Sequence, residues 1–294
     1  MKITKYHPFK SREAKEKYLK FYDARAKEWP IPSETKVVNT SYGPTLVRIS
    51  GSEDAKSLIL LHGAGSNSLT WIPNIEYLSK YYKTYTVDGV YGNGRSICTK
   101  TVKGPNEFVC WLDELVMALE LENGINMVGH SYGGWLTGQY ALKFPEKLNK
   151  IVMIAPAGTV LPVSKMFMIR AILCVIPHDY FLKSFSRWTF EDYIKKDKKG
   201  AEKEIEPLAL ASKCFKSNRP VKSTVLNDTE LKNIKTPALF IVGENEKIYS
   251  AQKAVERFNT VSPQIQTEII PNAGHELCKV QAELVNEMIL EFLK

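Results

Sequence analysis

The 294-residue chain lacks a disulfide framework, a secretory signal and a membrane-spanning run. Its five cysteines are an odd number, and no two of them stand in a CxxC spacing, which favours reduced thiols in a reducing compartment. The first 30 residues are charged and contain no apolar core, unlike a signal peptide. The longest apolar run, residues 166–177, contains Arg170 and is too short to cross a bilayer. These absences predict a cytoplasmic protein with no stable membrane insertion.

Patterns for nucleic-acid and metal binding are also missing. The net charge of +8 comes mainly from lysines scattered along the chain, without a zinc-finger, basic-heptad or RNA-binding aromatic pattern. No cluster of histidine and cysteine has the spacing of metal ligands, so we expect neither a metal ion nor another cofactor. A composition of 44% hydrophobic and 24% charged residues is typical of a globular protein with a sizeable core. The oligomeric state is not predicted.

Short apolar runs typical of strands alternate with helical patterns over most of the chain. An amphipathic helix is predicted over residues 11–29, and later helices over residues 75–82, 106–121 and 276–293. Strands are predicted over residues 36–40, 45–49, 57–61, 84–87, 125–128, 151–154, 238–242 and 267–270. This alternation predicts an α/β fold with a mostly parallel sheet and helices on both faces.

The strand pattern stops between residues 159 and 228. Helical segments rich in Phe, Met, Trp and Lys occupy this stretch instead. We therefore predict a core formed by residues 1–158 and 229–294, with residues 159–228 inserted as a helical cap. The cap should lie over the carboxyl ends of the strands, where open α/β sheets bind their ligands.

The stretch Gly129-His130-Ser131-Tyr132-Gly133 carries the strongest functional signal. It follows the apolar run 125–128 and leads into a helical pattern, so it reads as strand, sharp turn and helix. Such a turn places its central serine in a strained conformation with an exposed hydroxyl, and the glycines allow strand and helix to approach closely. The pattern predicts a nucleophilic serine, although a serine between glycines also occurs in ordinary turns.

With the motifs around it, the chain resembles the α/β-hydrolase family over nearly its whole length, including that family's eight-stranded type of sheet. The motifs occur in the family's order, each after a predicted strand. They are the oxyanion loop His62-Gly63-Ala64-Gly65, the loop from Asp88 to Ser96, the serine turn, the acid loop Gly243-Glu244-Asn245-Glu246, and Asn272-Ala273-Gly274-His275.

The resemblance implies a role for each part. Ser131 would be the nucleophile, and His275 the base that takes its proton. The family usually has aspartate three residues after the glycine of the acid loop, whereas this chain has Glu246 there, with Glu244 as the alternative. The backbone N–H groups of Ala64 and Tyr132 would bind the oxyanion.

These residues predict a serine hydrolase that cleaves carboxylic esters through an acyl-enzyme. The large apolar side chains of the cap favour small to medium apolar substrates, unless those side chains only pack the cap onto the sheet. Two alternatives stay open: hydrolysis of a lactone, amide, peracid or C–C bond as in meta-cleavage products, and a ligand-binding sensor that uses the same fold. The predicted partner is in each case a small molecule and not a nucleic acid.

Overall fold

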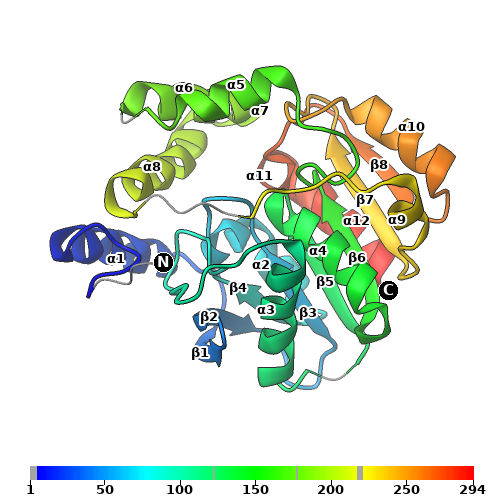
Figure 1. The fold of residues 1–294 in the computed structure, drawn as a ribbon, viewed down its shortest axis with the longest axis horizontal. Coiled ribbons are helices and arrows are strands. Elements are labelled where there is room, and N and C mark those ends of the chain that lie inside the picture. The colour runs from blue at the N-terminus through cyan, green and yellow to red at the C-terminus, as the bar shows by residue number, and fades with distance from the viewer. Residues whose placement is uncertain (1–4, 122, 177, 217–220) are drawn as a thin grey trace.

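The computed structural model of the protein describes residues 5–121, 123–176, 178–216 and 221–294, which form an α/β fold around one sheet (Figure 1). The sheet has eight strands in the order β1-β2-β4-β3-β5-β6-β7-β8. The strands are β1 (Glu34–Thr40), β2 (Gly43–Ser50), β3 (Ser57–Leu61), β4 (Lys83–Val87), β5 (Ile125–His130), β6 (Leu148–Ile154), β7 (Ala238–Gly243) and β8 (Gln266–Ile270). β2 pairs antiparallel with both of its neighbours, and the pairs from β4 to β8 are parallel. The predicted fold class is confirmed.

Each face of the sheet has its own apolar core, because neighbouring residues of a strand point to opposite sides. Along β5, Met127 packs in the first core and Val128 in the second. Helices α3 (Pro105–Ala118), α4 (Tyr132–Lys143) and α10 (Ala251–Val261) contribute to the first core. Helices α1 (Arg12–Ala26), α2 (Ile72–Leu78), α11 (Leu277–Val280) and α12 (Ala282–Leu293) contribute to the second. The middle strands are therefore apolar on both sides, as parallel strands between two helical layers must be.

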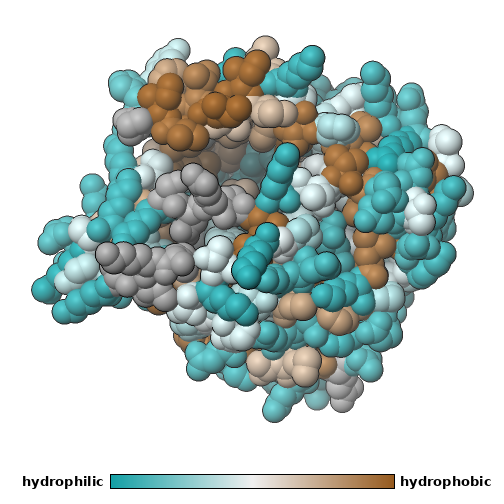
Figure 2. Space-filling view, in the orientation of Figure 1, coloured by the Kyte–Doolittle hydropathy of each residue, from teal (hydrophilic) through white to brown (hydrophobic). Residues whose placement is uncertain are grey.

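The connection between β6 and β7 contains five helices and, in its described part, no strand of the sheet. They are α5 (Lys165–Leu173), α6 (Asp179–Thr189), α7 (Glu191–Lys196), α8 (Lys198–Cys214) and α9 (Asp228–Lys232). Helices α5 to α8 stand apart from the sheet at the top and left of the view, with α8 next to α1 (Figure 1). Apolar side chains gather on the outer surface over α5 and α6 (Figure 2). The helical character predicted for this stretch is thus observed.

The C-terminal helix predicted over residues 276–293 is wrong in one respect, because Gln281 divides it into α11 and α12. Gln281 has φ −125° and ψ 47°, which is outside the helical region. Side chains from elsewhere bind two carbonyl groups beside the break: Asn74 donates to Cys278 and Lys196 to Val280. Among the described residues, no helix is both long enough and apolar enough to cross a membrane.

Candidate active site

Ser131 occupies the sharp turn between β5 and α4, in the conformation that the sequence predicts. Its φ is 54° and its ψ −113°, a strained combination for a residue with a side chain. A Cβ on Gly129 would lie 2.2 Å from the carbonyl oxygen of Gly133, so strand and helix approach too closely for any larger residue. The backbone holds the strain in place: Ser131 N–H donates to Ile154 at 2.8 Å, and Ala157 N–H donates to Ser131 at 3.0 Å.

His275 and Glu246 are joined by a hydrogen bond of 2.9 Å between Nδ1 and Oε2. The other carboxylate oxygen of Glu246 accepts the backbone N–H groups of Lys247 and Ile248 at 2.7 and 2.8 Å. The Glu246 side chain is fully buried. Glu244 is exposed and accepts the N–H of Asn272 instead. The structure therefore brings Glu246, and not Glu244, to the histidine.

The charge of Glu246 sets the protonation behaviour of His275. Burial alone lowers the pKa of His275, but the nearby carboxylate and the hydrogen bond to it raise the pKa above the ordinary histidine value. Because Nδ1–H donates to the carboxylate, the free tautomer leaves Nε2 unprotonated and able to accept a proton. This is the state that a general base requires.

His62 holds the loop that contains Ala64. Gly89 N–H donates to His62 Nε2 at 2.9 Å, so Nδ1 carries the ring hydrogen and donates to the Gly63 carbonyl at 2.7 Å. Burial lowers the pKa of His62, which keeps the ring neutral in this tautomer. The carbonyl of Gly63 and the N–H of Ala64 belong to one planar trans peptide and point in opposite directions. The bond from His62 thereby fixes the direction of the Ala64 N–H.

The same loop passes beside the nucleophile candidate. A Cβ built on Gly63 would lie 3.3 Å from Ser131 Cβ and 3.8 Å from Ser131 Oγ. On the other side, His130 Nε2 donates to the carbonyl of His275 at 2.8 Å. Burial and the neighbouring His275 lower the pKa of His130 to about 4. Two neutral histidines, His62 and His130, thus bind the backbone of the two loops that flank Ser131.

Ser131, Ala64 and His275 line one cleft of about 950 Å³ beneath the helices between β6 and β7. Phe167 of α5 and Phe185 of α6 form part of its upper wall. Other side chains that line the cleft come from α1, which the sequence predicts only as an amphipathic helix. The α1 residues that line the cleft are Tyr18, Phe21, Tyr22 and Arg25. The amphipathic pattern revealed this apolar side of α1 but not the surface that it faces.

A network of charged side chains, not predicted from the sequence, lines the cleft next to His275. Lys279 donates to Glu276 at 2.6 Å and lies 3.7 Å from Glu204 of α8, which also pairs with Arg25 of α1. Burial raises the pKa of Glu276, but Lys279 and the two nearby histidines outweigh it and lower that pKa to about 2. The network joins α1, α8 and α11. Among the described residues, no three His, Cys, Asp or Glu side chains are grouped to hold a metal ion.

The contacts of the loop from Asp88 to Ser96 are structural. The buried carboxylate of Asp88 accepts the backbone N–H groups of Ser68 and Arg95, both at 2.8 Å. It also accepts the hydroxyl of Tyr22 at 3.0 Å, which ties α1 to the loop. The Arg95 side chain pairs with Asp23 of α1 and does not line the cleft.

Comparisons with known proteins give the same family as the geometry. The family described as alpha/beta hydrolase fold matches residues 56–282. The chain is 33% identical over 298 residues to the carboxylesterase YbfK of Bacillus subtilis, covering 97% of this chain and 96% of that protein. The crystal structure of carboxylesterase CesB (YbfK) has a TM-score of 0.87 at 31% identity, covering 96% of this chain and 98% of that one. The naproxen esterase (carboxylesterase NP) of B. subtilis has a TM-score of 0.88 at 28% identity, covering 97% and 100%.

The chain therefore belongs to the α/β-hydrolase family.

Proposed function

We propose that this α/β-hydrolase is a carboxylesterase that works through an acyl-enzyme on Ser131. The observation that carries the proposal is the His275–Glu246 hydrogen bond of 2.9 Å, in a cleft that also contains the strained serine of the turn. A buried carboxylate bound to a histidine, in the same cleft as the serine of the turn, is the arrangement that activates serine. The similarity to a carboxylesterase, which extends over most of this chain's length, supports the same reaction.

In the proposed reaction, Ser131 Oγ attacks the carbonyl carbon of the ester while its proton passes to His275 Nε2. The tetrahedral intermediate collapses, and the same proton moves to the departing alkoxide, which leaves as an alcohol. A water molecule then attacks the acyl-enzyme by the reverse sequence and releases the acid. Glu246 stays ionised throughout, holds the tautomer of His275 and stabilises the imidazolium that forms twice per turnover.

The oxyanion of each intermediate would bind the backbone N–H groups of Ala64 and Tyr132. Tyr132 N–H lies at the start of α4, where the first N–H groups of a helix have no intrahelical partner and point toward negative charge. Ala64 N–H is directed by the bond between His62 and the Gly63 carbonyl. Each donor would contribute on the order of 3 kcal/mol to the transition state. His62 acts through this peptide and is a positioning residue.

We also propose that residues 159–228 form a cap that sets specificity, above a core formed by residues 1–158 and 229–294. Phe167 of α5 and Phe185 of α6 form part of the cleft wall. Apolar walls of this kind suit small to medium apolar substrates. A cap of this kind also excludes water from the reacting atoms. The five cysteines are free thiols, which supports a cytoplasmic setting.

A panel of matched substrates tests the proposed bond class. We expect kcat/KM for a p-nitrophenyl ester to exceed that for the corresponding anilide and for a lactone of similar size. The ester activity should be lost in Ser131→Ala and kept in Ser212→Ala, since Ser212 lines the same cleft but binds the Ala209 carbonyl on α8. Faster cleavage of the lactone or anilide would replace the ester assignment. Ligand binding without any turnover in the wild-type protein would identify a sensor.

A further inference from the structure

Helix α5 and the residues that follow it expose apolar side chains on the outer surface of the molecule (Figure 2). Thirteen large apolar side chains are exposed among the described residues, and eight of them lie within residues 166–180. We call these eight the outer patch, whose most exposed members are Ile172, Val175 and Tyr180. Single exposed apolar residues are common on protein surfaces, but a group of large ones marks a binding surface.

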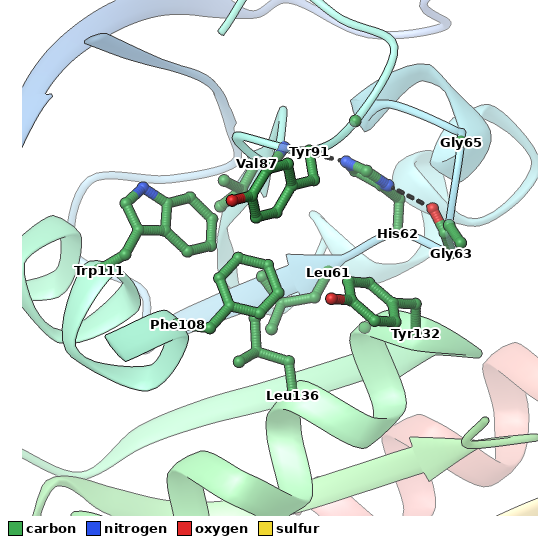
Figure 3. Close-up of a pocket in the computed structure, with 14 residues that line it drawn as sticks. Leu61, His62, Gly63, Gly65, Val87, Tyr91, Phe108, Trp111, Tyr132 and Leu136 are labelled. Atoms are coloured by element: carbon green, nitrogen blue, oxygen red, sulfur yellow. Dashed lines mark hydrogen bonds between the residues drawn. The ribbon is translucent and has the colours of Figure 1, made fainter. Parts of the chain in front are cut away.

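The apolar side chains beside the oxyanion loop have the opposite arrangement. Tyr91, Phe108, Trp111 and Tyr132 face a pocket of about 50 Å³ (Figure 3). Their rings pack on one another, with the Phe108 centroid 5.2 Å from that of Trp111 and 5.6 Å from that of Tyr132. Helix α5, in contrast, has no buried residue. The outer patch is therefore not part of a packed core and is available to a partner.

The outer patch extends to the rim of the cleft that contains Ser131. Val175 and Ile176 are members of the patch, and both also line the cleft. Phe21 of α1 and Lys213 of α8 line the cleft as well, and they also line a groove of about 890 Å³ between α1, α6 and α8. The patch, the cleft and this groove thus adjoin one another, so a partner on the patch lies at the entrance to Ser131.

The groove is strongly basic, and we call it the basic groove. Its described lining contains two acidic residues, Glu202 and Glu206, and six lysines: Lys17, Lys20, Lys183, Lys199, Lys203 and Lys213. The first four of these lysines are exposed and form no ion pair with another described residue. Their ammonium groups are available to anions from outside the protein.

The excess of positive charge belongs to the walls of the cleft, although lysines themselves occur throughout the chain. Residues 1–30, which contain α1, have nine Lys and Arg against four Asp and Glu, and residues 159–228 have thirteen against eight. These two segments carry a net charge of +10, and the rest of the chain carries −2. The surface around the cleft therefore attracts negative charge, and the remaining surface does not.

We propose that the outer patch and the basic groove form one surface that docks the protein on an anionic lipid layer. The apolar side chains of the patch enter the layer at the level of the headgroups, while the lysines of the groove meet the lipid phosphates. Tyr180 has an apolar ring with a polar tip, which suits the boundary between lipid and water. The protein lies on the layer reversibly, and no part of it spans the layer.

Charge and position favour a lipid layer over a protein partner. A second copy of this chain would bring two strongly positive surfaces together, which costs free energy. An acidic protein on the patch would cover Val175 and Ile176 and obstruct the entrance to Ser131. A lipid layer instead delivers apolar molecules to that entrance, so esters carried in the layer reach Ser131 directly. This last step rests on the proposed esterase function, whereas the docking does not.

The first test is sedimentation of the whole protein with vesicles of phosphatidylglycerol or phosphatidylcholine. The partition coefficient should be about tenfold or more higher for the anionic lipid, and about 0.5 M salt should remove most of this preference. The triple variant Lys17→Gln, Lys20→Gln, Lys199→Gln should bind the anionic vesicles on the order of 10²-fold more weakly, at roughly fivefold for each lysine. The matched control replaces three exposed lysines outside both walls by Gln and should bind like the wild type: Lys36, Lys56 and Lys253.

The second test places a charge in the outer patch. Ile172→Glu should lower the partition coefficient on the order of tenfold, because a carboxylate is excluded from the lipid layer. Met117→Glu on α3 is the matched control, since Met117 is 64% exposed and Ile172 is 62% exposed. Neither residue lines the cleft, so cleavage of water-soluble p-nitrophenyl acetate should be unchanged in both variants. Cleavage of p-nitrophenyl laurate carried in anionic vesicles should fall only in Ile172→Glu, in proportion to binding.

Equal binding to the two lipids, or unchanged binding in both Ile172→Glu and the lysine variant, overturns the docking surface. Binding of soluble polyglutamate as tight as that of anionic vesicles, and unaffected by Ile172→Glu, overturns it in favour of an acidic protein. A dimer in ultracentrifugation that Ile172→Glu dissociates overturns it in favour of a second copy. Ser131→Ala should bind vesicles like the wild type. Vesicle binding without any ester cleavage in the wild-type protein overturns the proposed esterase function and leaves the docking surface in place.

Discussion

The sheet core and the helices between β6 and β7 use apolar residues in opposite ways. Every residue of β5 and β7 is buried, and both strands lie between two apolar cores. Helix α5 has no buried residue, and Val175, just after it, is 82% exposed. Met166, Met168 and Ile172 of α5 are also exposed. Apolar residues are thus buried in the packed strands β5 and β7 but remain exposed to solvent on helix α5.

This contrast separates the proposed chemistry from the proposed specificity. Ser131 and Ala64 follow the buried strands β5 and β3, and His275 follows the edge strand β8. Hydrogen bonds from His62 and His130 hold the backbone of the loops that contain Ala64 and His275. Precise positions of this kind are what a catalytic site requires. The helices that cover the cleft have fewer buried contacts, which is typical of segments with low local stability. Changes in the core should therefore alter turnover, and changes in the cap should alter substrate preference.

The largest effect should come from Ser131, the proposed nucleophile. Ser131→Ala should lower kcat for p-nitrophenyl butyrate on the order of 10⁶-fold, as loss of a triad serine does elsewhere. The fold should remain intact in circular dichroism, since the change removes one oxygen atom. A folded variant that keeps more than about a tenth of the activity would disprove the nucleophile.

The next effect should come from Glu246. Glu246→Gln should lower kcat on the order of 10⁴-fold, because the amide no longer stabilises the imidazolium of His275. Glu244→Gln, two residues away, is the matched control and should be close to wild type, because its carboxylate binds Asn272 N–H and not His275. Equal losses in the two variants would show that neither carboxylate acts on His275 directly.

The pH profile gives a second measurement on the same pair. The proposed mechanism needs neutral His275, and Glu246 raises the pKa of His275. The acid limb of kcat/KM should therefore lie above the ordinary histidine pKa in the wild type, with activity rising as the pH increases through it. In Glu246→Gln the favourable charge is gone, so the limb of the residual activity should move to lower pH. A limb that does not move would mean that another group controls it.

A smaller loss is expected at His62, which touches no reacting atom. His62→Asn keeps a donor near Nδ1 for the Gly63 carbonyl, whereas His62→Gln keeps an acceptor near Nε2 for Gly89. If the first bond directs the Ala64 N–H, the Gln variant should lose kcat by about 10²-fold, with KM little changed, and the Asn variant far less. Equal losses in kcat at similar melting temperatures would reduce His62 to a packing role.

The smallest effects on turnover are expected in the cap. Phe185→Ala removes part of the wall of the cleft, and Met168→Ala removes an exposed side chain of α5. The first change should reorder a series of esters with different alcohols, while kcat for the smallest acetate stays within a few-fold because the core is untouched. The second should leave both quantities close to wild type. A ranking that is the same in both variants would contradict a specificity role for the cap.

The sequence predicted the parts of the molecule that leave a local pattern. Apolar runs located the strands. Ser131 and His275 each follow a predicted strand, which placed both residues at the carboxyl ends of the strands. The preference for Glu246 over Glu244 came from the resemblance to the acid loop of the family, and the structure agrees in the contact of Glu246 with His275. The catalytic roles of these residues stay predictions.

Contacts between distant segments could not be predicted in this way. The bond from Gly89 N–H to His62 and the bond from His130 to the His275 carbonyl involve backbone groups, which have no residue-type signal. The placement of α1 beside the cleft depends on tertiary packing that its amphipathic pattern does not specify. The exposed apolar side chains of α5 also differ from the usual expectation, because large apolar residues are mostly found in cores.

The central claim is that Ser131 forms a covalent acyl intermediate that His275 and Glu246 then help to hydrolyse. The most direct test is mass spectrometry of the enzyme quenched within milliseconds of mixing with excess p-nitrophenyl butyrate. We predict one butyryl group per chain, located on the peptide that contains Ser131, formed together with a burst of p-nitrophenol. Turnover without any adduct on that peptide, or an adduct on another residue that disappears at the rate of turnover, would contradict the claim.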